Sequence, residues 1–375
     1  MPKKTRRFGT QGRLYPEDNY LVPRTVEGAD FIRRVKEGKY IVLFAPRQTG
    51  KTTFFQLALE KLTTTDPTYF PIQLNFEVYE DCTPLEFYDG LTGDIHEKIT
   101  DVFQERRQTP PDTIRHLLET THLTNQLSLR TFLRALGKVL KDQRIVLIID
   151  EFDAIPRSAV KGFLRVLREI YLSGRTRCPH SVGIIGVKDI TQLDYDRSIS
   201  PFNIQDEFHL PNFTFDQVQE LFGQYTDEVG QVIAPDVIQS LHRQTAGQPY
   251  LVNRLAQILT AEMHTPKHET IMMPHFATAH RQLIHERNTN IEHLLTNVRK
   301  DRRFEALLMK IASYEQAPMF NPYNELMNEL AIYGVITKGA DGRCEILNPI
   351  YHYCITQAFQ PAVTRYLPQH PKIYR

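Results

Sequence analysis

The sequence predicts an α/β fold: a three-layer sandwich with a parallel sheet, followed by a helical region and a small C-terminal domain. Between residues 20 and 210, strand-like and helix-like segments alternate, which is typical of a parallel sheet covered by helices on both faces. A glycine-containing loop at residues 45–53 joins the first predicted strand to the helix after it. A later, continuously apolar strand ends in two acids, Asp150 and Glu151.

The predicted elements of the sandwich follow from hydrophobic periodicity and from the positions of glycine and proline. The β-branched and leucine run at residues 144–149 is expected to be a central strand covered on both faces. Because the acid pair follows this run directly, we expect the strand at residues 181–187 to lie between it and the first strand. Strands are expected at residues 40–44, 69–76, 144–149, 181–187 and 208–210, and helices at residues 52–62, 85–103, 129–140 and 160–172, with a polar insertion around residues 109–112.

The chain as a whole is expected to have four parts. Residues 1–19 are basic and poor in large aliphatic side chains, which predicts a flexible arm. Residues 20–210 form the α/β domain, and residues 211–299 form a small helical domain with its connecting helices. Residues 300–375 contain two predicted helices, a hairpin around residues 339–342 and a closing helix at residues 349–359. These last elements together describe a winged helix.

The amino-acid composition disfavours several classes of protein. The chain has 375 residues, 41% of them hydrophobic and 24% charged, as is ordinary for a globular protein. A net charge of +1 gives no overall field that would select a polyanionic partner. The apolar runs are far shorter than the roughly 20 residues that span a bilayer, so no membrane partner is expected. The four cysteines are scattered without CxxC spacing, which disfavours disulfides and zinc and favours a cytoplasmic location.

The loop at residues 45–53 matches the Walker A pattern GxxxxGK[ST] except at its first position. Its residues are Ala45, Pro46, Arg47, Gln48, Thr49, Gly50, Lys51, Thr52 and Thr53. The backbone N–H groups of such a loop surround phosphates, and the helix that begins near Lys51 directs its positive end at them. Lys51 is expected to neutralise phosphate oxygens and Thr52 to coordinate Mg²⁺. An ordinary glycine-containing turn is the alternative, but the flanking strand and helix favour a P-loop NTPase.

The acid pair Asp150-Glu151 has the position of a Walker B motif, at the C-terminal tip of a buried strand. Asp150 is expected to hold Mg²⁺ through water. Glu151 is expected to polarise an attacking water as a general base. The alternative is that the acids cap the following helix, a role for which Asp153 is better placed. The predicted catalytic residues are therefore Glu151 and Lys51.

With these motifs, the chain resembles the prokaryotic AAA-like ATPases of the STAND and archaeal-ATPase branch, relatives of the origin-recognition ATPases, over about residues 20–359. The resemblance implies ATP as the nucleotide and a lid formed by residues 211–263. It is carried by Asp18-Asn-Tyr-Leu-Val-Pro-Arg24, the two Walker motifs, Gly186-Val-Lys-Asp-Ile190, Ser200-Pro-Phe-Asn203, Asn212-Phe-Thr214 and Gly247-Gln-Pro-Tyr-Leu-Val-Asn253.

The resemblance also implies roles for residues outside the Walker motifs. Pro249 would pack near the base or sugar, and Pro23 and Arg24 would lie beside adenine. Arg254 could sense bound phosphate, and a polar residue at Lys188 or Asp189 could sense the γ-phosphate. Without the resemblance, the segment before Pro249 is a turn leading into a helix, Arg254 is a surface arginine, and the last two are surface-loop residues.

Three functions are compatible with these motifs. The first is a slow ATPase switch whose lid and winged helix signal to a partner; because the chain ends just after the winged helix, an effector would act in trans or be absent. The second is a DNA-binding ATPase that uses the winged helix and the basic arm, but the helix before the hairpin carries Glu325 and Glu329 and no Lys or Arg. The third is a scaffold that holds nucleotide without turnover, which Glu151 disfavours. Oligomeric state stays open, although no arginine stands in a convincing finger context.

Overall fold

The computed structural model describes residues 5–44, 48–174, 177–186, 206–299, 301–313 and 315–359. Three residues of the predicted phosphate loop, Ala45, Pro46 and Arg47, lie outside these ranges. The same holds for Lys188 and Asp189 and for the motif at residues 200–203.

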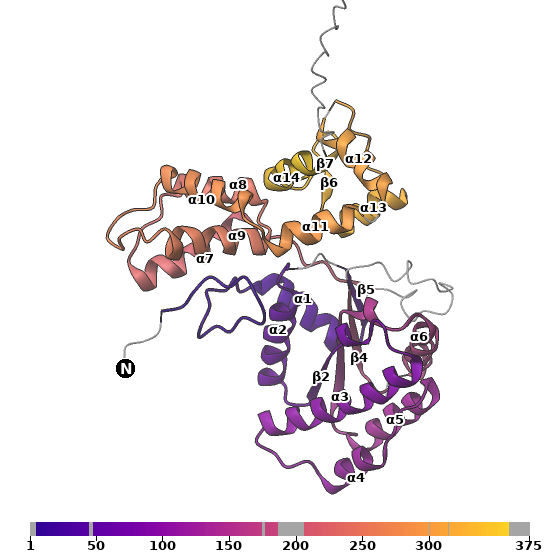
Figure 1. Ribbon diagram of the computed structural model, residues 1–375. Helices are drawn as coiled ribbons and strands as arrows, with labels where there is room; N and C mark the ends of the chain where they lie inside the picture. The colour runs from indigo at the N-terminus through magenta and orange to yellow at the C-terminus, as the bar shows by residue number, and fades with distance from the viewer. Residues whose placement is uncertain are drawn as a thin grey trace, which may run out of the picture.

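A five-stranded parallel sheet organises the first half of the chain, with the strand order β2-β3-β4-β1-β5 (Figure 1). The strands are β1 (Tyr40–Phe44), β2 (Tyr69–Asn75), β3 (Arg144–Asp150), β4 (Ser181–Gly186) and β5 (Asp206–Glu207). The insertion of β4 between β1 and β3 confirms the predicted additional-strand arrangement. The prediction was wrong for the last strand, which ends before residues 208–210; only the N–H of Phe208, donating to the Val42 oxygen at 2.9 Å, continues the pairing.

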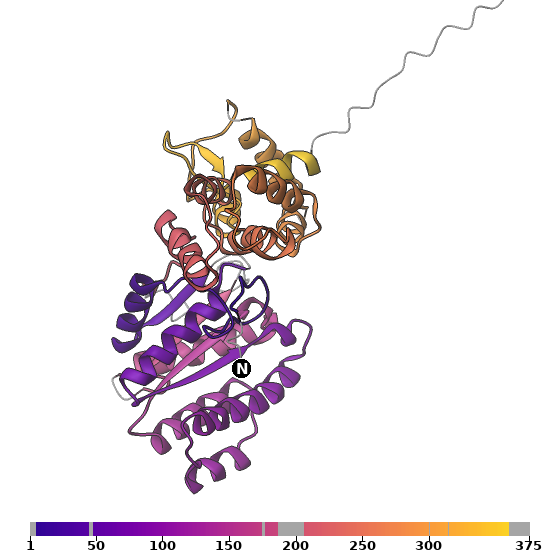
Figure 2. The ribbon, with the colours of Figure 1, turned by 90° about the vertical axis from the view of Figure 1, so that its left-hand side faces the viewer.

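Helices cover both faces of the sheet because the strands are apolar on both sides. In β3, Ile145, Leu147 and Ile149 face one buried cluster, shared with α3, α5 and α6, whereas Val146 and Ile148 face a second, shared with α1 and α2. Figure 2 shows the resulting three layers. The helices of this region are α1 (Thr25–Lys36), α2 (Lys51–Thr65), α3 (Pro84–Glu105), α4 (Asp112–Thr120), α5 (Gln126–Val139) and α6 (Arg157–Leu172), with 3-10 turns η1 (Glu77–Tyr79) and η2 (Phe152–Ala154).

The second half of the chain is mostly helical and lies beside the C-terminal edge of the sheet in Figures 1 and 2. Its helices are α7 (Phe215–Val229), α8 (Pro235–Thr245), α9 (Pro249–Gln257), continued by a π-helical turn η6 (Ile258–Glu262), α10 (Met273–His285), α11 (Thr289–Arg299), α12 (Arg302–Ala312), α13 (Glu325–Ile332) and α14 (Pro349–Phe359). An antiparallel hairpin, β6 (Ile336–Lys338) and β7 (Cys344–Ile346), separates α13 from α14. One continuous buried apolar cluster extends from α7 to α14.

The N-terminal segment belongs to this same cluster, where the sequence predicted a flexible arm. Phe8 is 2% exposed and packs against the rings of Tyr20, Phe222 and Tyr225, at centroid distances of 4.9, 5.4 and 5.7 Å. Arg6 adds an ion pair of 2.7 Å to Glu228. The sequence did not reveal this packing, because the aromatic side chain that anchors the segment is a single residue and forms no periodic hydrophobic pattern. We call residues 24–210 the α/β body, and residues 5–22 with 211–359 the helical body.

All four cysteines are free. Cys178, Cys344 and Cys354 are buried, whereas Cys82, between η1 and α3, is only half-buried. Burial raises the pKa of the Cys178 thiol to about 12 and that of Cys354 to about 11. Among the described helices, none has the length and apolar character needed to cross a membrane.

Candidate nucleotide site

The two predicted Walker motifs meet at the C-terminal edge of the sheet. β1 and β3 run parallel with β4 between them, so the segments that follow both strands emerge at the same edge. The Thr52 hydroxyl donates to Asp150 Oδ2 at 3.1 Å. Lys51, Thr52, Asp150 and Glu151 all line one cleft of about 540 Å³. The structure therefore brings the two predicted Walker motifs together at one cleft.

The loop before α2 has the backbone form that a phosphate cradle needs. Gly50 is the N-cap of α2 and has φ 81°, a left-handed conformation that favours glycine. Lys51 opens α2 and is 6% exposed, and Thr49 is 4% exposed. Because Gly50, Lys51, Thr52 and Thr53 line the cleft, the N-terminal end of α2, which carries the positive end of the helix dipole, borders it.

Some residues around this cleft have a strained backbone conformation. Among the described residues, six that are not glycine have positive φ: Arg24, Gln48, Arg107, Glu151, Ala246 and His264. Gln48 and Glu151 line the cleft, and Arg24 lines the cavity beside it. Such conformations persist where the surrounding structure enforces them, commonly at functional sites. Glu151, with a φ of 50°, follows directly on β3 and is the N-cap of η2.

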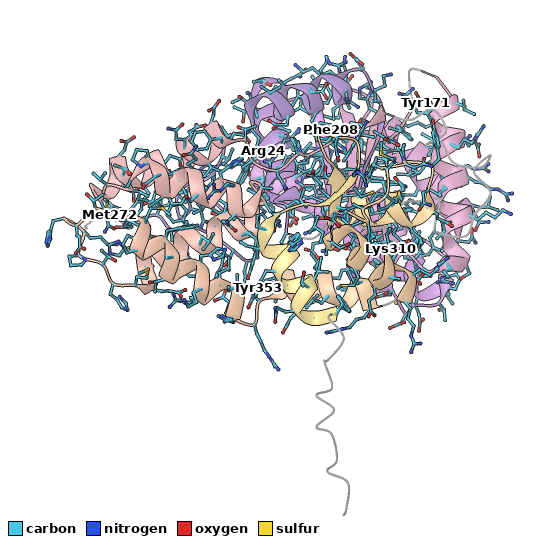
Figure 3. All side chains as sticks on the ribbon, turned by 90° about the horizontal axis from the view of Figure 1, so that it is seen from above. Arg24, Tyr171, Phe208, Met272, Lys310 and Tyr353 are labelled. Atoms are coloured by element: carbon cyan, nitrogen blue, oxygen red, sulfur yellow. The ribbon has the colours of Figure 1, made fainter. Side chains whose placement is uncertain are left out.

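A second cavity of about 330 Å³, largely apolar, adjoins the cleft and contains the predicted base-side residues Pro23, Arg24 and Pro249. Arg24 is 6% exposed, and burial lowers its pKa to about 10. Its Nη1 donates to the Pro211 oxygen at 2.7 Å and its guanidinium stacks 4.7 Å from the centre of the Phe213 ring. Its Nη2 has no partner. In Figure 3, Arg24 is labelled where the purple helices of the α/β body meet the salmon helices of the helical body.

The Gly247-Gln-Pro249 segment is shaped by close packing. Gly247 has φ 68°, and a Cβ there would come 1.9 Å from the Phe213 oxygen, so only glycine fits. Gln248 caps α9 by accepting from the Leu251 N–H at 2.7 Å, and its Nε2 donates to the Gln48 oxygen at 3.4 Å. The segment therefore begins a helix, as its sequence predicts, and also contacts the phosphate loop.

Several residues of the cleft were missed by sequence reasoning. Asn75 pairs in register with Asp150, and Glu77 follows it in η1. Their position at the end of the strand next to β3 could have identified them. Thr289 and His293 of α11 also line the cleft, and Gln48 Nε2 donates to Thr289 Oγ1 at 2.7 Å. No sequence motif identifies Thr289 and His293 as residues of the cleft.

The N-terminal segment forms one wall of the cleft, through residues 9–14. Residues 7–19 make a closed loop, because Arg7 and Asn19 form a β-bridge at its base. At its tip, the Leu14 N–H donates to Thr53 Oγ1 at 3.4 Å, and Arg13 lies 3.5 Å from Glu60. In Figure 1 this dark-blue segment runs between α7 and the α1–α2 layer. The loop thus connects the helical body with the α/β body beside the nucleotide site.

Arg254, which the resemblance suggests as a phosphate sensor, lies outside the residues that line the two cavities. Its guanidinium pairs with Glu286 at 2.7 Å and with Glu262. These hydrogen bonds raise the pKa of Arg254 and lower that of Glu262. In this structure Arg254 joins α9, η6 and the end of α10.

The chain is similar to known proteins in family and in fold. A family model described as an AAA-like domain matches residues 11–352. The Walker-type ATPase PABY2304 of Pyrococcus abyssi is 14% identical, with 93% of this chain and 99% of that chain covered and a TM-score of 0.65. The ORC1 protein of Aeropyrum pernix, solved in complex with DNA, is 12% identical to this chain and has a TM-score of 0.45. The match covers 90% of this chain and 94% of the ORC1 chain. The RuvB Holliday junction branch migration motor of Thermotoga maritima is 13% identical to this chain and has a TM-score of 0.44. The match covers 85% of this chain and 91% of the RuvB chain.

No curated protein sequence matches the chain. At 14% identity, the Pyrococcus structure supports the fold, and it does so over nearly the whole length of both chains. The family match extends from the N-terminal loop through both Walker motifs and into α14. The chain therefore belongs to the AAA-like domain family and has the fold of a P-loop ATPase.

Proposed function

We propose that the protein is a slow, Mg²⁺-dependent ATPase that acts as a nucleotide-controlled switch and signals to a partner protein. The observation that carries this proposal is the 3.1 Å contact between Thr52 Oγ1 and Asp150 Oδ2, inside a cleft bounded by both bodies. Four free cysteines support a cytoplasmic location.

The phosphates of ATP would lie over residues 45–53, from Ala45, Pro46, Arg47 and Gln48 through Thr49 and Gly50 to Thr52 and Thr53. In this proposal Lys51, already buried at the first position of α2, neutralises phosphate oxygens. Glu151 holds and polarises the attacking water, taking its proton as general base. Its place beside Asp150 in the cleft supports that role.

Mg²⁺ fits the donor set at this edge of the sheet. A hydroxyl and a carboxylate oxygen are hard ligands of the kind it prefers, and the contact between Thr52 and Asp150 supports a shared ion between them. Bound there, Mg²⁺ would neutralise charge that develops on the phosphates. Thr52 would serve as a direct ligand, and Asp150 would act through water.

Adenine would occupy the apolar cavity beside the cleft, between Pro23 and Arg24 on one side and Pro249 on the other. The partnerless Nη2 of Arg24 supports this, because a buried guanidinium N–H that lacks an acceptor costs free energy until a ligand supplies one. The ring nitrogens of adenine are suitable acceptors.

ATP would act as a switch by drawing the helical body toward the phosphate loop. We assign residues 211–263 as the lid, which together with its connecting helices makes up residues 211–299, and residues 300–375 as a winged helix. The hairpin β6–β7 between α13 and α14 supports the second assignment. The hydrogen bond from Gln48 to Thr289 links the phosphate loop to α11, which leads into α12. A change at the phosphates could therefore reach the winged helix.

A protein partner is favoured over DNA by the surface of the winged helix. Tyr323 is 95% exposed and Met319 is 62% exposed, at the start of the α13 region and beside the hairpin. Large apolar groups of this kind are typical of protein contacts. The helix α13 itself carries Glu325 and Glu329, whose charge opposes that of DNA phosphates.

The test compares ATP turnover by wild type, Lys51→Ala and Glu151→Gln, with and without duplex DNA. We expect slow wild-type hydrolysis that ignores DNA and is lost in both variants, with Glu151→Gln still binding ATP. Asp153→Asn is the matched control, since Asp153 lies two residues further on, in η2, and outside the cleft. Rapid hydrolysis by Glu151→Gln would remove its assigned role, and stimulation by DNA would favour a DNA-binding ATPase.

A further inference from the structure

We propose that Asn253 of α9 recognises a ribose hydroxyl of the nucleotide and makes the site selective for ribonucleotides over deoxynucleotides. The proposal rests on the ATP binding proposed above. It concerns a residue that neither the Walker motifs nor the charged groups of the cleft would single out.

Asn253 lies at the junction of the two cavities. The base-side cavity and the phosphate-side cleft share a small set of lining residues, among them Gly50, Pro249 and Asn253. In a nucleotide, the group between the base and the phosphates is the ribose. A ligand that fills both cavities therefore places its sugar beside Asn253.

The side chain of Asn253 has an unsatisfied acceptor. The residue is 6% exposed, and its Oδ1 has no hydrogen-bond partner. Its Nδ2 donates to the Pro249 oxygen at 2.8 Å. This bond fixes the orientation of the amide, because the flipped amide would bring two oxygens together. Leaving a buried acceptor unpaired costs free energy, so the site gains when a donor arrives.

The chemistry of the acceptor identifies the ligand group. A phosphate oxygen cannot pair with Oδ1, since both are acceptors. Between the base and the phosphates, the only donors of a ribonucleotide are the 2′ and 3′ hydroxyls. A site built to hydrogen-bond a hydroxyl rejects the analogue that lacks it, because its own polar group then stays unpaired. Asn253 is thus a specificity residue that touches the sugar.

The experiment measures dissociation constants for ATP, 2′-deoxy-ATP and 3′-deoxy-ATP with wild type, Asn253→Ala and the nearly isosteric Asn253→Leu. We expect wild type to bind at least one deoxynucleotide about 10-fold more weakly than ATP. In both variants ATP itself should bind about 10-fold more weakly, and the difference between the three nucleotides should disappear.

Gln257→Ala is the matched control. It removes an amide one turn further along α9, where Gln257 Nε2 donates to the Phe8 oxygen, and Gln257 lines neither cavity. This variant should keep the wild-type discrimination. If Asn253 merely supports the start of α9, its variants will weaken all three nucleotides equally and keep their ratio, which overturns the proposal. Equal binding of the three by wild type also overturns it and leaves ATP binding intact, whereas no ATP binding by wild type overturns the proposed function as well.

Discussion

The interior of the helical body and the seam between the two bodies are built differently. Inside the helical body, apolar side chains from the N-terminal loop, α7–α11 and the C-terminal elements form one continuous cluster. Along the seam lie the cavities of about 330 and 540 Å³ described above. A further cavity of about 500 Å³ is lined by Glu207 of β5 on one side and by Asn328 of α13 and Lys338 of β6 on the other. Contacts that cross the seam include polar ones, such as Gln48 with Thr289 and Gln248 with the Gln48 oxygen.

This difference indicates where the molecule can move. Densely packed interiors transmit displacement, whereas a hollow and polar boundary between domains permits relative motion. We therefore expect the proposed lid and the C-terminal elements to move as one unit over the sheet, with the proposed nucleotide site in the seam. The following predictions test this contrast between packed interior and open seam.

The largest effect is expected from a cavity in the shared interior. Leu255 of α9 is fully buried, so Leu255→Ala should destabilise the helical body by about 2–5 kcal/mol. The chain has no tryptophan, so Tyr353→Trp in α14 and Tyr171→Trp in α6 can report on each body separately in urea. Leu255→Ala should lower the urea midpoint seen at position 353 far more than that at 171. A midpoint at position 353 that does not move would show that α14 does not share the interior of α9.

A smaller effect is expected from Arg254, whose side chain is 17% exposed. Arg254→Ala leaves Glu286 and Glu262 without their cation and should cost about 1–2 kcal/mol, since solvent screens part of the network. Arg303→Ala is the control, because that arginine is 69% exposed in its pair with Asp301 and should change stability by less than about 0.5 kcal/mol. Equal urea midpoints for the two variants would contradict this.

The ion pairs of Arg254 also predict that the free energy of unfolding depends on pH. The hydrogen bond from Arg254 lowers the pKa of Glu262 below its ordinary value. A carboxyl with a lowered pKa stabilises the fold above its unfolded pKa, near 4.3, and loses this contribution as pH falls through its folded pKa. The stability difference between wild type and Arg254→Ala should thus be full at pH 7 and shrink below about pH 4. Urea midpoints of both proteins across this range check it, and a constant difference would count against the pair.

Arg6, next to the base of the N-terminal loop, and Arg13, at its tip, should respond unequally to mutation. Arg6 pairs with the helical body through side chains that are 29% and 20% exposed, whereas Arg13 and Glu60 are 46% and 55% exposed at 3.5 Å. Arg6→Ala should cost about 1 kcal/mol and Arg13→Ala less than about 0.5 kcal/mol. The Tyr353→Trp reporter in urea measures both. A larger loss for Arg13→Ala would mean that the loop is held mainly by the α/β body.

The smallest change in stability is expected at the seam itself. Gln48→Ala and Thr289→Ala remove one exposed hydrogen bond and should leave the urea midpoint within about 0.5 kcal/mol of wild type. Because the two side chains act as a pair, each variant should weaken ATP binding about 3-fold, and the double variant no further. Additive losses of affinity would show that the bond does not link the bodies when ATP is bound.

Local patterns were sufficient to locate four of the five strands and the two Walker motifs, but not the last strand, β5. The apolar run that ends at Asp150 and the loop around Lys51 each carry their own signal, and parallel strand geometry brings them together. The N-terminal loop could not be predicted in this way, because Phe8 and Arg6 anchor this part of the chain to residues more than 200 positions away. Thr289 was missed for the same reason: its contact with Gln48 depends on how the helical body sits over the sheet.

The cysteines give the native chain one further property. The thiolate is the nucleophilic form of cysteine, and burial keeps Cys178 and Cys354 protonated at neutral pH. Cys344 is buried as well, so a maleimide dye should attach first at Cys82, which follows the turn that begins with the cleft residue Glu77. The unmodified sequence thus offers an attachment point for fluorescence five residues after a residue of the proposed nucleotide cleft, with no cysteine to remove beforehand.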